Sequence, residues 1–296
     1  MGAPGARVIC PDCHSPLLEG KCGACGFAVK EIDGLPVYLS KADFSDTTFS
    51  SYTENYETIS QDDLAASMQE PVYLQTQTEK FAGYLGDVNG KDVCEIGVGQ
   101  GRLLKKLESK AVRSLVGVDI ATNYLRKLRN EVKAKLIVAN AENLPFQDEF
   151  DVIVSSDVLE HVLNVGDFMI SVNQALRMGG QVLLKVPFEE NLLQYAQRTG
   201  CKYRFVHLRT FSKDNLTRLM LDSGFQPVKF HYDGFTKYRV RKWIPKYRVT
   251  RHVYFRRFLA HYESENHMNA VPNWLGNLMM EPLEIVVRAV KTKNLI

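Results

Sequence analysis

From residue 91 onward the chain alternates short runs of β-branched and apolar residues with longer segments of helical periodicity. Such alternation is typical of a parallel sheet that is covered by helices on both faces. The pattern predicts helices at about 101–110, 122–133, 166–177 and 212–223, the last with Ser212 as its cap and Gly224 as its stop. It predicts strands at 92–96, 114–120, 136–140, 151–155, 182–186, 227–232 and 284–290.

The composition is that of an ordinary globular protein. Of 296 residues, 45% are apolar and 24% charged, and the formal net charge is +3. These values exclude a disordered, collagen-like or disulfide-stapled chain. The longest apolar stretch is interrupted by Glu281, Pro282, Glu284 and Arg288, so no membrane span is predicted. Because the N-terminus lacks the basic start and apolar centre of a secretory signal, we expect a cytoplasmic location.

Charge is distributed unevenly along the chain. Residues 31–80 contain ten acids and two bases, whereas residues 229–257 contain ten bases and one acid. The small net charge therefore conceals an acidic and a basic segment, and each must be interpreted separately.

Four cysteines near the N-terminus form two Cys-x-x-Cys pairs, Cys10 with Cys13 and Cys22 with Cys25. Two such turns supply the four thiolates that tetrahedral zinc takes in closed structural sites. Four unrelated thiols or two disulfides are the alternatives. Since a closed site leaves no position for water, we expect a structural or recognition role for the zinc.

A glycine-rich turn follows the first predicted strand, where Glu95 precedes Gly97, Gly99 and Gly101. Asp119 at the end of the second strand is placed to accept hydrogen bonds from ribose hydroxyls. A dinucleotide enzyme would show the same features, but Arg102 stands where its fingerprint requires glycine. Glu95 would repel a phosphate and attract an ammonium or sulfonium group. Together with Glu142 after the third strand, suited to an adenine amino group, these residues favour S-adenosylmethionine.

The motifs at 95–104, 118–119, 141–146, 150–162 and 176–187 together resemble those of class I S-adenosylmethionine-dependent methyltransferases. The resemblance implies a Rossmann-like seven-stranded sheet in the order 3-2-1-4-5-7-6, with the last strand antiparallel. It also implies that the three glycines surround the amino-acid end of the cofactor and that Asp119 binds the ribose. The residues expected beside the cofactor are Glu95, Gly97, Gly99, Gly101, Asp119, Ile120, Ala141, Glu142 and Asp157.

The cysteine segment resembles small zinc-ribbon modules that are fused to methyltransferases or act as their partners. It is therefore a candidate for contact with a protein partner. We expect a zinc-ribbon-like module over residues 1–40 and an acidic linker or flap over 41–80, in which Tyr52 and Tyr56 could close over the cofactor. The methyltransferase domain is expected over 81–296, with a substrate-side insertion at about 233–282.

Two histidines are candidates for the base that removes a proton from the acceptor, His161 after the fourth strand and His207 before the next helix. Either histidine is also compatible with a role in lining the cofactor pocket or in packing. A third interpretation is a divalent metal bound by Asp157, Glu160 and His161, which would share one face of a helix and which resemble a triplet of quinone-biosynthesis methyltransferases.

The basic, aromatic insertion predicts a negatively charged partner. A phosphorylated or lipid-linked sugar, another anionic small molecule, RNA and an anionic membrane surface all suit it. Alternatively, its bases pair with the acidic segment. The first hypothesis is methyl transfer to oxygen of a small molecule or of a glycan- or lipid-linked acceptor. The second is base N-methylation of ribosomal or transfer RNA by a zinc-ribbon-bearing enzyme, and a third is a non-enzymatic cofactor sensor.

Overall fold

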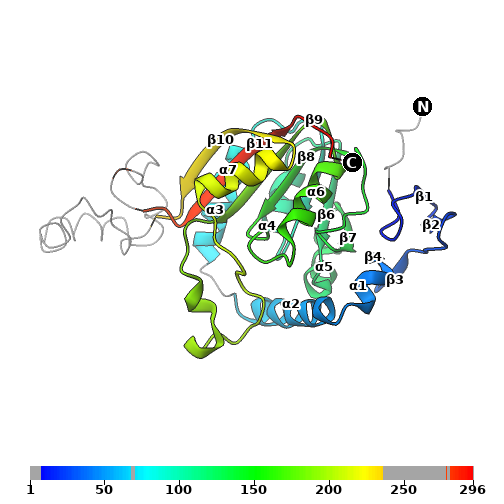
Figure 1. Ribbon diagram of the computed structural model, residues 1–296, viewed down its shortest axis with the longest axis horizontal. Coiled ribbons are helices and arrows are strands. Elements are labelled where there is room, and N and C mark those ends of the chain that lie inside the picture. The colour runs from blue at the N-terminus through cyan, green and yellow to red at the C-terminus, as the bar shows by residue number, and fades with distance from the viewer. Residues whose placement is uncertain (1–7, 68–70, 236–277, 279–280, 296) are drawn as a thin grey trace, which may run out of the picture.

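The computed structural model describes residues 8–67, 71–235, 278 and 281–295. Nine of its strands form one sheet in the order β10-β11-β9-β8-β5-β6-β7-β4-β3 (Figure 1). The strands of this sheet are β3 (Lys30–Ile32), β4 (Leu35–Tyr38), β5 (Asp92–Ile96), β6 (Ser114–Asp119), β7 (Lys135–Ala139), β8 (Phe150–Ser156), β9 (Leu176–Pro187), β10 (Phe225–Asp233) and β11 (Glu284–Lys291).

Seven helices accompany this sheet in the described part of the chain. They are α1 (Lys41–Ser45), α2 (Thr47–Ala65), α3 (Pro71–Tyr84), α4 (Arg102–Glu108), α5 (Thr122–Leu128), α6 (Val165–Ala175) and α7 (Lys213–Asp222), with two short 3-10 turns at Leu192–Tyr195 and Gln197–Thr199. None of the described helices has the length and apolarity that crossing a membrane requires.

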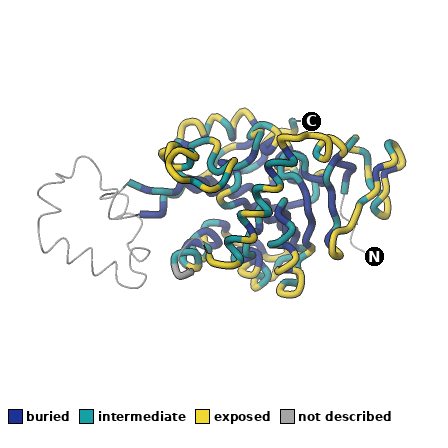
Figure 2. Tube along the Cα trace, turned by 90° about the horizontal axis from the view of Figure 1, so that it is seen from below, coloured by how far each residue is buried: buried dark blue, intermediate teal, exposed yellow. Residues whose placement is uncertain are grey.

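The core consists of two apolar layers, one on each face of the sheet. Helices α3, α4 and α5 contribute to one layer, and α6 and α7 contribute to the other. Alternate residues of a strand serve opposite layers, as Val93 and Cys94 of β5 do. Because both faces are covered, every residue of β5 is buried, and Figure 2 shows the buried strands inside an exposed outer layer of helices.

The seven predicted strands lie side by side in this sheet, and β11 is antiparallel to both β9 and β10. The prediction of seven strands was two short, because residues of the N-terminal segment extend the sheet beyond β7. Strand β4 pairs parallel with β7, through Val37 with Val138 and Tyr38 with Ala139, and β3 pairs antiparallel with β4. The predicted helix at 166–177 ends at Ala175, since β9 already begins at Leu176.

The cysteine segment adds the small hairpin of β1 (Leu17–Leu18) and β2 (Lys21–Cys22). It is attached to the loop after β7: the Ile9 amide donates to the Pro145 carbonyl at 3.0 Å, and Asn143 Nδ2 donates to the Pro11 carbonyl at 2.9 Å. Figure 1 shows this hairpin beyond the β7 edge of the sheet. The N-terminal module is thus continuous with the edge of the sheet that carries the cofactor motifs.

The predicted linker or flap, residues 41–80, contains α1, α2 and most of α3. Helix α2 is fastened to α5 by Glu57, whose carboxylate accepts hydrogen bonds from the Thr122 amide at 2.6 Å and the Asn123 amide at 3.2 Å. Most of the predicted insertion at 233–282, and with it most of the basic segment, lies outside the described residues.

Candidate active site and zinc centre

The four N-terminal cysteines come together at two tight turns. The Sγ atoms of Cys10 and Cys25 are 3.5 Å apart, as are those of Cys13 and Cys22, and all four lie within 4.8 Å of one another. Tetrahedral zinc with Zn–S bonds of about 2.3 Å places sulfurs roughly 3.8 Å apart, so the four thiols fit this ion. The geometry favours the zinc interpretation over that of unrelated thiols.

The glycine-rich turn after β5 leaves the backbone open to a ligand. Gly97 has a φ of 75°, and a Cβ at this position would lie 2.2 Å from Val158 Cγ2. Gly99 has a φ of 48°, and the space in front of its backbone is open within 4 Å. Only glycine adopts both conformations without strain, and only glycine fits the close contact at Gly97. Gly101, with a φ of 74°, meets Leu128 in the same way.

Two buried carboxyl groups flank this turn. The Glu95 side chain is 4% exposed, and its Oε2 has no hydrogen-bond partner within the described chain. Burial, and then the nearby Asp119, raise the pKa of Glu95 well above its ordinary value. Asp119 accepts hydrogen bonds from the amides of Gly99 and Ala121, both at 2.9 Å. Burial raises its pKa to about 6, although these amides act in the opposite direction.

A cavity of about 680 Å³ opens at the carboxyl ends of β5, β6 and β8. It brings together the predicted residues Glu95, Gly97, Gly99, Asp119, Ile120, Ala141, Asp157, His161 and His207. Tyr52 and Tyr56 of α2 line it as well, which fits the proposed flap. The fit to S-adenosylmethionine rests on the partnerless Glu95 oxygen and the open space at Gly99.

Two predicted residues lie away from the cavity, and a third, Asp157, lines it but is paired with a lysine. Gly101 and Glu142 are not among the residues that line the cavity. The Glu142 carboxylate accepts hydrogen bonds from the amides of Leu163 and Asn164, at 2.7 and 3.0 Å, and so holds the loop before α6. Asp157, in a left-handed conformation with φ of 58°, pairs with Lys185 Nζ at 2.8 Å.

His161 is enclosed, and both of its ring nitrogens face neighbours. Its Nδ1 accepts a hydrogen bond from the His207 amide at 3.4 Å, and its Nε2 lies 3.7 Å from Glu160 Oε1. Burial, and then the neighbouring His207 ring, lower the pKa of His161 to about 3. His161 therefore remains neutral at physiological pH and supports the turn that carries His207.

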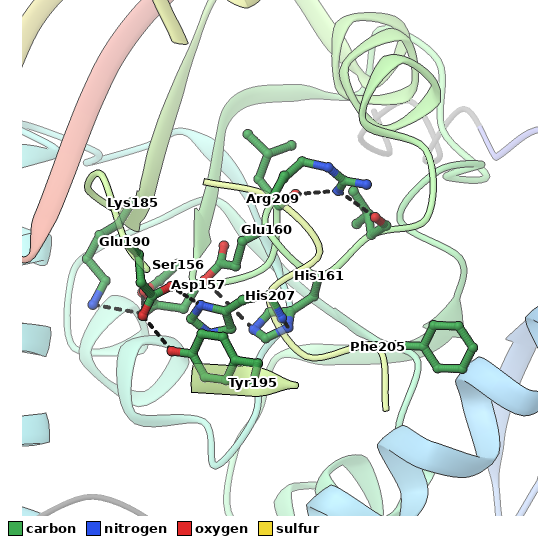
Figure 3. Close-up of polar contacts among 12 residues, drawn as sticks. Ser156, Asp157, Glu160, His161, Lys185, Glu190, Tyr195, Phe205, His207 and Arg209 are labelled. Carbon is green, nitrogen blue, oxygen red and sulfur yellow. Dashed lines mark hydrogen bonds and ion pairs between the residues drawn. The ribbon is translucent and has the colours of Figure 1, made fainter. Parts of the chain in front are cut away.

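His207 has a different environment (Figure 3). Its Nδ1 contacts Glu190 Oε2, while the other Glu190 oxygen accepts a hydrogen bond from Tyr195 at 2.5 Å. Burial raises the pKa of Glu190, but the hydrogen bonds from His207 and Tyr195 lower it by more than burial raises it. The pKa of Glu190 therefore lies below its ordinary value. With Nδ1 facing a carboxylate, the neutral ring carries its proton there, and Nε2 is left as a proton acceptor.

Sequence reasoning missed Glu190 and Tyr195, although both line the cavity. Glu190 lies in irregular chain after β9 and Tyr195 ends a short 3-10 turn, and no periodic pattern there indicates which side chains face inward. The sequence offers one indication of their role, which is that Glu190 is an acid in the same loop region as a histidine. Tyr73 of α3 and Glu284 of β11, linked by a hydrogen bond of 2.9 Å, were missed because 211 residues separate them in the sequence.

Glu160 is completely buried, and neither of its oxygens has a hydrogen-bond partner within the described chain. Its ligand atoms lie within 4.8 Å of those of His161 and His207, so these three residues are able to hold a metal ion. The predicted triplet of Asp157, Glu160 and His161 requires correction, because Asp157 is turned to Lys185 and His207 takes its place. Burial raises the pKa of Glu160 well above its ordinary value.

The fold and the position of the cavity agree with comparison with known proteins. A family model described as "Methyltransferase domain" matches residues 67–229, more than half of the chain. The chain belongs to the class I S-adenosylmethionine-dependent methyltransferase family. The model begins after α2, so Tyr52 and Tyr56 are cavity residues that lie outside the matched region.

Relatives match over about half of this chain. An uncharacterized Methanocaldococcus jannaschii protein is 28% identical over 46% of the chain and 64% of its own length. A Mycobacterium tuberculosis protein named as a probable S-adenosylmethionine-dependent methyltransferase is 27% identical over 47% of the chain and 50% of its own length. The chain thus spans between half and two-thirds of the length of these curated relatives.

Among solved structures, one chain of the complex containing the Haloferax volcanii Trm112 methyltransferase activator aligns with a TM-score of 0.57. The alignment covers 80% of this chain and 98% of that chain, at 13% identity. At this identity the similarity shows the fold alone.

Proposed function

We propose that the protein transfers a methyl group from S-adenosylmethionine to a hydroxyl oxygen of a small molecule or of a glycan- or lipid-linked acceptor. The observation that carries this proposal is the contact of His207 Nδ1 with Glu190 in the cavity that Gly99 and Asp119 also line. A base is required because a hydroxyl must lose its proton as the new bond forms. His207 is favoured over His161, whose two ring nitrogens both face neighbours.

In the proposed reaction the cofactor supplies a methyl group on a positively charged sulfur. The acceptor oxygen forms a bond to the methyl carbon, the carbon–sulfur bond breaks, and the hydroxyl proton moves to His207 Nε2. Glu190 stabilises the resulting imidazolium through Nδ1, and Tyr195 holds Glu190 in place. Tyr52 and Tyr56 exclude water from the cavity, and alignment of the two substrates supplies much of the rate acceleration.

The zinc-ribbon-like module is proposed to stabilise the edge of the sheet and to offer a surface to a protein partner. Recognition of an anionic part of the acceptor is assigned to the basic segment 229–257, on the strength of its charge alone. Methylation of an RNA base remains the second hypothesis. A labelling experiment separates the hypotheses of oxygen methylation and RNA methylation.

The test follows methyl label from S-adenosylmethionine into a cell extract that has been divided into small-molecule, lipid and RNA fractions. We expect label in the small-molecule or lipid fraction. Replacement of the base, as in His207→Gln, should lower single-turnover methyl transfer by about 100-fold, within the range for general bases. Glu190→Gln should lower it by about tenfold, because the amide no longer stabilises the imidazolium.

The binding of S-adenosylhomocysteine to each variant is the control, and we expect it to change little. His161→Gln is the matched histidine variant and should retain more activity than His207→Gln. Label that enters mainly RNA would contradict the choice of acceptor. Full activity of both histidine variants would contradict a histidine base.

A further inference from the structure

The charge of the cavity is strongly one-sided. Seven carboxyl side chains line it, among them Glu95, Asp119 and Glu160. Within the described part of the chain, Arg102 is the sole lysine or arginine that lines it. Lys185, which is not among the lining residues, offsets part of this charge by pairing with Asp157 at 2.8 Å and lying 3.5 Å from Glu284. An anionic group that enters the cavity therefore meets mainly carboxyl groups and one guanidinium, that of Arg102.

Arg102 has hydrogen-bond donors that no described residue uses. It begins α4 directly after the glycine-rich turn, and its Nη2 donates to Gln100 Oε1 at 3.3 Å. No ion pair of Arg102 occurs within residues 8–67, 71–235 and 281–295, and its buried Nε has no hydrogen-bond partner there. A guanidinium has five N–H donors, so most of them are available to a ligand.

Gln100 is itself oriented. Its Nε2 donates to the side chain of Asp63 at 2.8 Å and to the Asp63 carbonyl at 3.2 Å, which directs its oxygen toward Arg102. Helix α2, through Asp63, therefore positions the guanidinium from across the cavity.

S-adenosylmethionine carries one negatively charged group, the carboxylate of its amino-acid end. A carboxylate that leaves water for a cavity lined by acids is stable only if a cation and hydrogen-bond donors receive it. We propose that Arg102 binds this carboxylate while Glu95, at the other end of the same turn, receives the ammonium group. Arginine suits the task because its planar fork forms two parallel hydrogen bonds with a carboxylate.

Arg102, the residue that interrupts the dinucleotide fingerprint, thus has a proposed function. This assignment concerns cofactor binding in the absence of an acceptor, so it is tested independently of the proposed oxygen methylation. The test measures the affinity of the full-length protein for S-adenosylhomocysteine and for its decarboxylated analogue, S-adenosyl-3-thiopropylamine, by titration calorimetry. These two ligands differ only in the carboxylate.

We expect Arg102→Met to weaken S-adenosylhomocysteine binding by about 10- to 100-fold, the usual cost of losing a hydrogen bond to a charged group. Binding of the decarboxylated analogue should change less than about twofold or become tighter, because a positive charge facing its ammonium is removed. Arg102→Lys should give an intermediate loss for S-adenosylhomocysteine, since it retains the charge but not the fork.

Lys106→Met, on the exposed side of the same helix, is the matched control for loss of one positive charge. It should leave both affinities unchanged. Retained binding of the decarboxylated analogue also shows that Arg102→Met is folded. Equal losses of affinity for both ligands would overturn the assignment, because Arg102 would then only stabilise the glycine-rich turn. No loss of affinity for either ligand would also overturn it, because Arg102 would then have no part in binding.

Discussion

Asp119 is the residue whose ionisation should control cofactor affinity. The resemblance to class I methyltransferases assigns its carboxylate to the ribose hydroxyls, which donate hydrogen bonds to the ionised form. Burial raises its pKa to about 6, so the group is ionised above pH 6 and protonated below. If the bound nucleoside favours the ionised form, affinity for S-adenosylhomocysteine should fall by about tenfold between pH 7 and pH 5.

Calorimetric titration across this pH range checks the prediction. Asp119→Asn should bind more weakly and with little dependence on pH, whereas Asp222→Asn, at the exposed end of α7, should behave like the unaltered protein. An unchanged pH dependence in Asp119→Asn would assign the titration to another group.

Residues in local motifs were predictable, and residues brought in by long-range packing were not. Gly97 and Asp119 belong to strand-to-helix turns whose chemistry can be deduced from a few neighbours in sequence. Glu190 becomes meaningful only beside His207, 17 residues further along the chain. Glu142 shows the reverse case: its position after the third strand was correct, but its carboxylate satisfies the amides of Leu163 and Asn164.

At the level of elements, β4 connects the N-terminal segment to the sheet by parallel pairing with β7. Loss of zinc should loosen the cysteine turns, which are bonded to the loop after β7, and so weaken this edge. Cys13→Ser is expected to abolish stoichiometric zinc binding and to lower the melting temperature by about 5 °C or more, since structural zinc contributes directly to folding.

Metal analysis, thermal unfolding and amide hydrogen exchange in β4 and β7 measure these effects. Cys201→Ser, a half-buried cysteine outside the cluster, should retain zinc and stability. A zinc-free variant with unchanged exchange in β4 would show that the module and the sheet are energetically independent.

The elements of the αβ repeat were predictable because their strands are buried on both faces and contain short apolar runs, such as residues 136–139 of β7. Helix α2 was not predicted, since among its described residues only Phe49, Tyr52 and Ser60 are buried and most of its length is polar. Strands β3 and β4 have three and four residues, too short for a period-two pattern to indicate them. Tertiary contacts, not local periodicity, define these elements.

For the molecule as a whole, the sequence predicted the order of parts and the sheet that joins the cofactor motifs. It indicated that Tyr52 and Tyr56 could close over the cofactor, but not that they stand on a long helix that also brings Asp63 to the cavity. Tyr52, Tyr56 and Asp63 of α2 line the same cavity as the glycine-rich turn, opposite the motifs of the family model. The side of the cavity that α2 forms depends on how α2 packs on α5. Neither helix alone determines this packing.

The acidic lining of the cavity has a consequence for turnover. Methyl transfer turns a sulfonium into a neutral thioether, so the bound nucleoside loses one positive charge while the carboxyl groups around it remain. The reaction thereby weakens the attraction that held its own donor, and product inhibition should be mild. We expect S-adenosylmethionine to bind several-fold more tightly than S-adenosylhomocysteine. Equal affinities in calorimetric titrations would contradict it. If the affinities differ as expected, the charge lost from the bound nucleoside favours its release without a separate conformational signal.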